Sequence, residues 1–135
     1  MKRHATANWK GSGKEGKGIL STQSETLSNV QYSYRDRFED GTGTNPEELV
    51  AAAHAGCFSM KLSFILGNAG VVPEDIMTKC IITLGDGVIT SSHLEVKVKA
   101  TIDEQKFQEC IIEAKETCPI SKSLNTTITA SAELV

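Results

Sequence analysis

Apolar and polar residues alternate along several stretches of the chain, which is typical of strands with one buried face. The clearest case is the segment 88–102, in which Leu94, Val96 and Val98 are separated by charged residues. The segment 75–84 precedes it across an Asp-Gly pair, a common two-residue hairpin turn. The pattern therefore predicts a hairpin of two long strands in the middle of the chain.

Shorter and looser alternation marks further strands near both ends of the chain. The first 44 residues are punctuated by glycines, and the segments 4–9, 19–20 and 30–34 between them are predicted strands. Near the other end, the segment 126–134 alternates again and is predicted to be the last strand. Most of the strands thus fall into an early group and a middle group.

A strong helix start follows the first group of strands. Asn45 suits the capping position, Pro46 the first helical position, and two glutamates occupy the first turn. The predicted helix continues to residue 66 and is apolar almost all round, so we expect it to be buried. A second helix is predicted over 103–117 and a short helical turn over 119–124.

The order of these elements favours an α+β fold with antiparallel sheets, since strands and helices do not alternate regularly. The 135 residues suit a single domain, 1–135. A net charge of −3 argues against a nucleic-acid binder. With no signal peptide and no apolar run approaching the ~20 residues of a membrane span, we expect a cytoplasmic protein without a membrane partner.

The chain contains four cysteines, Cys57, Cys80, Cys110 and Cys118. Structural disulfides are rare in the cytoplasm, and the paired C-x-x-C spacing of a structural zinc site is absent. Each cysteine is therefore either a small buried hydrophobe or a redox group. For Cys80 and Cys110 we favour the buried hydrophobe, and spacing alone favours it for the other two as well.

Helical spacing places Cys57 and Cys118 on the predicted core faces of their helices. Cys57 shares a face with Ala53, Met60 and Phe64. Cys118 shares a face of the second helix with residues spaced three or four positions apart along the sequence: Phe107, Cys110, Ile111 and Ala114. Two such faces packed together could bring the cysteines within disulfide reach, although spacing alone does not prove that they meet.

A reactive cysteine needs a stabilised thiolate. Cys57 lies about 18 Å along the helix from its start, too far for the helix dipole, which acts within the first turn. A cation must therefore come from elsewhere, and the candidates are Arg35, Arg37, His54 and Lys61.

Two motifs give the chain a family resemblance. Residues 37–60 contain T-N-P-E-E-L and A-A-A-H-A-G-C-F-S-M, and residues 118–121 read Cys-Pro-Ile-Ser. Together they resemble the OsmC/Ohr family, the osmotically inducible protein C and organic hydroperoxide resistance proteins. Trp9 and the Gly-Lys-Gly turn at 16–18 match the osmotically inducible branch, as does Arg37 with the phenylalanine after it.

The resemblance implies an intertwined homodimer, in which antiparallel sheets wrap two central helices and the active sites lie at the subunit interface. It also implies a thiol-dependent peroxidase of oxidative and osmotic stress defence. The peroxidatic cysteine falls on Cys57, the resolving cysteine on Cys118, and the site arginine and glutamate on Arg37 and Glu47. The expected partners are an organic hydroperoxide and a dithiol reductant, for which the resemblance suggests the lipoyl type, with no metal or flavin cofactor.

Two other functions compete with this one. The first is a non-catalytic stress protein that binds a hydrophobic ligand in the same pocket. The second, a general disulfide oxidoreductase, is disfavoured by the missing C-x-x-C motif. Candidate pocket walls are apolar residues near the two motifs: Phe38, Met60, Phe64 and Ile120.

Overall fold

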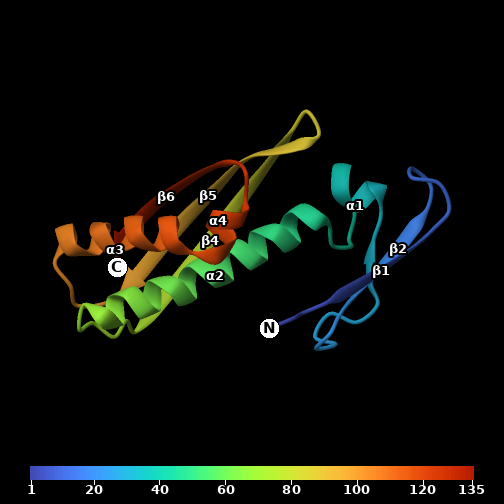
Figure 1. The fold of residues 1–135 in the computed structure, drawn as a ribbon. Helices are drawn as coiled ribbons and strands as arrows, with labels where there is room; N and C mark the ends of the chain where they lie inside the picture. The colour runs from blue at the N-terminus through green and yellow to red at the C-terminus, as the bar shows by residue number, and fades with distance from the viewer. The chain divides into compact units, whose positions relative to one another are not determined.

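The computed structural model describes all 135 residues. Its internal contacts divide the chain into two compact units, Met1–Leu49 and Val50–Val135 (Figure 1). The sequence-based assignment of 1–135 to one domain stays a prediction.

The first unit is built on a small antiparallel sheet in the order β1-β2-β3. Its strands are β1 (Ala5–Lys10), β2 (Lys17–Thr22) and β3 (Val30–Tyr32). Gly18 on the middle strand pairs with Trp9 on one side and Tyr32 on the other. The two aromatic rings lie 5.3 Å apart, and a side chain at Gly18 would collide with both. Glycine at this position therefore allows the aromatic pair to close over the sheet.

A short helix, α1 (Tyr34–Phe38), follows β3. The strand predicted over 30–34 is therefore wrong at its end: β3 stops at Tyr32, and residue 34 begins a helix that was not predicted. The strand ends because Ser33 caps the helix, and its hydroxyl accepts a hydrogen bond from the Asp36 N–H at 3.2 Å. The pattern Ser-x-x-Asp is a known start signal, so the sequence did carry this information.

The long helix α2 (Pro46–Asn68) begins where the sequence predicts. Asn45 caps it by accepting a hydrogen bond from the Glu48 N–H at 2.8 Å. The helix ends in a Schellman motif: Gly70 has a φ of +79°, and the N–H of Val71 donates to the Leu66 carbonyl at 2.9 Å.

The second unit contains a three-stranded sheet in the order β4-β5-β6. Its strands are β4 (Asp75–Gly85), β5 (Val88–Lys99) and β6 (Thr127–Leu134). The predicted hairpin is antiparallel, but β5 and β6 pair in parallel, which corrects the expectation of purely antiparallel sheets. The parallel pair arises because α3 (Glu104–Thr117) and α4 (Pro119–Ser123) form a helical crossover between the two strands.

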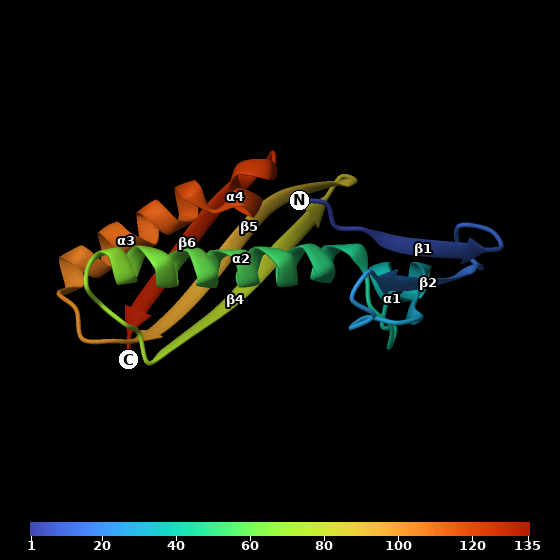
Figure 2. The same cartoon turned by 60° about the horizontal axis from the view of Figure 1, so that its bottom comes forward.

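The core of this unit lies between the sheet and two helices. Both views show α2 and α3 along the same face of the β4–β5–β6 sheet (Figures 1 and 2). Leu94 and Val98 of β5 and Phe58 and Leu62 of α2 are completely buried there, together with Phe107 of α3. This apolar layer fixes the positions of α2, which contains Cys57, and of α3, which ends at Cys118.

The outward face of α2 is not covered, which corrects the prediction that the helix is buried all round. The buried face consists of His54, Phe58, Leu62, Ile65 and Leu66. Met60 and Phe64, which were expected to share a core face with Cys57, are 66% and 68% exposed. The single chain therefore leaves a row of large apolar side chains in contact with solvent.

By length and composition alone, α2 would suffice to cross a membrane, although the sequence analysis expected no such run. The core helix of a soluble protein passes the same test. The buried face of α2 packs on the sheet of its own unit, as a core helix does.

Candidate active site

The structure brings Cys57 and Cys118 together across 61 positions of sequence. The Cys118 thiol donates to the Cys57 sulfur, and the two sulfur atoms are 3.0 Å apart. Both are free thiols. A disulfide has an S–S length of about 2.05 Å, so a small movement would join them.

Different local structures position the two cysteines. Cys118 lies at the junction of α3 and α4, where it ends the first helix and begins the second. It is fully buried, as are the residues predicted to share its face: Phe107, Cys110, Ile111 and Ala114. Cys57 lies within α2 beside the buried face and is half-buried. One sulfur is thus fixed in the core, while the other borders the surface.

The surroundings of Cys57 in its own unit favour the protonated thiol over the thiolate. Burial and the hydrogen bond with Cys118 raise the pKa of Cys57. The backbone N–H of Ile120 and the positive charge of Lys61 act in the opposite direction, but the pKa stays above its ordinary value. Lys61 was one of the candidate cations from the sequence, and it is not sufficient. A nucleophilic Cys57 therefore needs a further cation.

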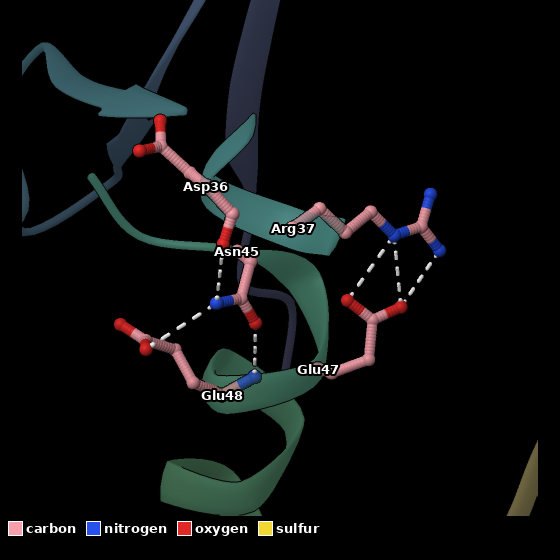
Figure 3. A network of polar contacts seen from close by, with 5 residues as sticks. All are labelled: Asp36, Arg37, Asn45, Glu47 and Glu48. Atoms are coloured by element: carbon pink, nitrogen blue, oxygen red, sulfur yellow. Dashed lines mark hydrogen bonds and ion pairs between the residues drawn. The ribbon is translucent and has the colours of Figure 1, made fainter. Parts of the chain in front are cut away.

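The first unit contains an arginine, Arg37, in a well-defined ion pair with Glu47. The Arg37 Nε and Nη2 atoms donate to Glu47 Oε1 at 3.0 and 2.7 Å, and Nε also reaches Oε2 at 3.1 Å (Figure 3). Burial alone would raise the pKa of Glu47, but its bonds to Arg37 hold that pKa below the ordinary value. Glu47 is thus ionised at neutral pH, and it fixes one edge of the guanidinium while Nη1 remains free.

A second set of polar contacts, of which Figure 3 draws the bonds of Asn45, fixes the segment around this pair. The Asp36 carboxylate accepts from the Gly43 N–H and from the Ser33 hydroxyl, each at 2.8 Å, and both bonds lower the pKa of Asp36. The Asn45 side chain donates to the Asp36 carbonyl at 3.2 Å. The chain from α1 to the start of α2 is thereby folded back on itself, so Arg37 and Glu47 face each other.

An aromatic hollow lies beside Arg37 in the first unit. It encloses about 280 Å³, and its lining residues are Trp9, Gly13, Tyr32, Ser33, Tyr34, Arg37, Phe38 and Pro46. Of the pocket walls proposed from the sequence, only Phe38 lines it. The hollow therefore combines an apolar surface with one cationic group.

His54 belongs to a buried polar network and not to the candidate cations, which corrects the sequence analysis. Its side chain is completely buried, with Nδ1 2.7 Å from the Ser92 hydroxyl and Nε2 2.7 Å from the Ser121 hydroxyl. Burial lowers the pKa of His54, so the ring is neutral at pH 7. The Cys80 sulfur lies 3.2 Å from the Ser92 hydroxyl at the edge of this network.

The neutral, buried state of His54 predicts a pH-dependent stability. The unfolded chain binds a proton near the ordinary histidine pKa of about 6.5, whereas the folded chain binds it only at lower pH. The contribution of neutral His54 to the stability of the folded chain is thus complete above about pH 6.5, and it is lost as the pH falls below that value. The free energy of unfolding in urea should fall as the pH decreases from about 7.5 to about 5, and His54→Gln should remove the part due to His54, which is at most about 1.4 kcal/mol per pH unit. Equal slopes in both proteins would contradict this assignment.

The fold and the thiol pair define a small α+β protein with adjacent free cysteines. The sequence model of the OsmC-like protein family matches residues 39–133, and the chain belongs to this family. It is 43% identical to peroxiredoxin OsmC of Escherichia coli over 133 residues, which cover 95% of this chain and 93% of the relative. It is 31% identical to the organic hydroperoxide resistance protein OhrB of Bacillus subtilis, over 71% and 73% of the two chains.

Solved structures show the same fold. The crystal structure of OhrB from Bacillus subtilis superposes with a TM-score of 0.73 at 26% identity, covering 98% of both chains. An OsmC-like protein of unknown function from Vibrio cholerae gives a TM-score of 0.79 at 17% identity, covering 98% of this chain and 99% of that one. The α+β class and the OsmC-like fold predicted from the sequence are thereby confirmed.

Sequence reasoning missed the serines of the buried network and the role of the Ile120 N–H. Ser121 was visible in the Cys-Pro-Ile-Ser motif, but no spacing rule links it to His54, which is 67 positions away. Ser92 lies inside an alternating strand and resembles any other strand residue. Cys110 is buried in the core, as expected.

Proposed function

We propose that this protein is a cysteine-based peroxidase that reduces organic hydroperoxides to alcohols in oxidative stress defence. The observation that carries the proposal is the 3.0 Å separation of two free sulfurs, Cys57 and Cys118. The printed names of the relatives, a peroxiredoxin and a hydroperoxide resistance protein, support the same reaction class.

In the first step, the Cys57 thiolate attacks the terminal oxygen of the hydroperoxide. The O–O bond breaks, the departing alkoxide takes a proton and leaves as the alcohol, and Cys57 becomes a sulfenic acid. Arg37 supplies the positive charge that lowers the pKa of Cys57 and binds the peroxide through its free edge. Glu47 keeps the guanidinium in that orientation.

In the second step, the Cys118 sulfur attacks the Cys57 sulfenic acid. An S–S bond forms, the S–O bond breaks, and water leaves. The disulfide protects Cys57 from further oxidation. An external dithiol, for which a lipoyl-type compound is our candidate, then returns both cysteines to thiols by exchange and is itself oxidised.

We propose that the protein works as a homodimer. Met60 and Phe64 project from the uncovered face of α2, which also carries the small residues Ala53 and Gly56. Small residues allow a second helix to approach closely, and the large apolar side chains gain by leaving water. A second copy of this chain would cover the face, and the active sites would lie at the interface between the subunits.

The aromatic hollow favours an organic substrate. An alkyl or aryl group resting on Trp9, Tyr32 and Phe38 would lie next to Arg37, which binds the peroxide oxygen atoms. Phe38→Ala should therefore raise KM for cumene hydroperoxide by about tenfold, because the apolar contact between this ring and the organic group is lost. Hydrogen peroxide has no organic group and serves as the internal control. An equal change for both peroxides would count against the hollow as the substrate site.

One assay separates catalysis from ligand binding. The purified protein is mixed with tert-butyl hydroperoxide and an excess of dihydrolipoamide, and peroxide consumption is followed over many equivalents. The peroxidase proposal predicts continued turnover. A protein that only binds a hydrophobic ligand would consume no more peroxide than the reductant does alone.

A further inference from the structure

Two side-chain contacts join α2 to the segment that follows α3. The first is the Cys57–Cys118 contact, and the second is the hydrogen bond between His54 and Ser121. His54 lies one helical turn before Cys57, and Ser121 lies one turn after Cys118. The two contacts are therefore neighbours, and each constrains the spacing at the other.

The histidine contact is the more rigid of the two. His54 is completely buried, and its other ring nitrogen is bonded to Ser92 of β5 at 2.7 Å. The imidazole thus bridges the sheet and α4. Turning the ring would leave buried polar groups without partners on both sides, which is costly in a protein interior.

Few other polar contacts hold α4 in place. The helix is only five residues long, Pro119–Ser123, and its start has no side-chain cap. Ser121 is the only residue of α4 whose own side chain bonds to another element, since Ser123 bonds only within α4. The backbone N–H of Ile120 also bonds to the Cys57 sulfur, so α4 meets α2 at both contacts. Cys118 immediately precedes this helix, so its position depends on where α4 is held.

We propose that His54 is a positioning residue for disulfide formation. This inference rests on the proposed peroxidase function. Through Ser121, His54 keeps Cys118 facing Cys57, so that the Cys118 sulfur attacks the sulfenic acid as soon as it forms. Without this bond, Cys118 spends less time in the reactive position. The sulfenic acid then persists, and a second peroxide molecule can oxidise it to the sulfinic acid.

Two matched pairs of variants test the inference. Ser121→Ala removes the bond to α4, whereas Ser92→Ala removes the equivalent bond to β5 from the same ring. His54→Gln carries an amide that reaches as far as Nε2 and retains the bond to Ser121. His54→Asn carries the same amide only as far as Nδ1 and retains the bond to Ser92. Within each pair a buried hydrogen bond is lost in both variants, but only one variant loses the link to α4.

The measurement separates the two chemical steps. Each reduced protein receives one equivalent of cumene hydroperoxide and is quenched at successive times with a thiol alkylating agent and dimedone. Mass spectrometry then counts sulfenic acid at Cys57 and disulfide between Cys57 and Cys118. Urea unfolding of all four variants shows whether stability losses within each pair are similar.

We expect Cys57 oxidation at the wild-type rate in all four variants. Disulfide formation should slow by about tenfold or more in Ser121→Ala and His54→Asn, because even a small misplacement of the reacting groups slows a reaction by this much. In Ser92→Ala and His54→Gln it should stay within about twofold of wild type. Equal rates within both pairs would overturn the inference. If one variant does not fold, the other pair decides.

Failure of the proposed function would look different. A wild-type protein that forms no sulfenic acid and no disulfide would disprove the peroxidase mechanism itself. A wild-type protein that completes both steps, with Ser121→Ala and His54→Asn behaving identically to it, would disprove only the role of His54.

Discussion

Replacing Cys57 with serine should abolish peroxide reduction. A serine hydroxyl is not ionised at neutral pH and is a poor nucleophile toward peroxide, so turnover should fall by about 1,000-fold or more. Steady-state consumption of cumene hydroperoxide with a dithiol reductant measures this. Cys80→Ser is the matched control, because Cys80 is also a partly buried thiol but lies in the His54–Ser92 network. Unchanged turnover in Cys57→Ser would disprove the mechanism.

Cys118→Ser extends the same experiment to the second step. We expect it to consume one equivalent of peroxide per site at the wild-type rate and then to stop. The product should be a Cys57 sulfenic acid, which dimedone traps, because no neighbouring thiol is left to condense with it. Full multiple turnover in this variant would show that Cys118 is not the resolving residue.

Replacing Arg37 with glutamine should shift the pH profile of Cys57 oxidation toward alkaline pH. The thiolate is the reactive form, and its fraction grows as the pH rises through the Cys57 pKa. Burial and Cys118 raise that pKa, so removing the proposed cation should move the profile up by about one to three pH units. At pH 7 the rate of sulfenic acid formation would then fall by about 10- to 1,000-fold.

Arg37→Lys and Glu47→Gln are the matched controls for this prediction. Lysine keeps the charge but not the planar fork, so the pH profile should shift less than with glutamine. Glu47→Gln keeps the arginine but weakens its two-point attachment, which should reduce the rate with little change in the pH profile. A profile that is the same in Arg37→Gln and wild type would show that Arg37 does not activate Cys57.

Local signals predicted the elements that position the site. The cap at Asn45, the first-turn glutamates and the glycine at the end of α2 fix that helix through contacts a few residues apart. The buried face of α3 also follows from spacing alone, because Phe107, Ala114 and Cys118 face the core as predicted. The Arg37–Glu47 pair was expected from the family resemblance, and the structure contains it.

The failures have a common physical origin in contacts between distant segments. Spacing placed Cys57 on the core face with Met60 and Phe64, because α2 has apolar residues on every side and periodicity cannot identify the buried one. The partners of His54 lie 38 and 67 positions away. The parallel pairing of β5 with β6 likewise depends on where the crossover helices pack.

The central claim is that Cys57 and Cys118 form a redox pair, and one mass measurement tests it most directly. The reduced protein is treated with one equivalent of cumene hydroperoxide, alkylated and digested without reductant. We expect a loss of two hydrogen atoms and one cross-linked peptide that joins Cys57 to Cys118. A cross-link that involves Cys80 or Cys110, or four thiols that remain free after the peroxide is consumed, would contradict it.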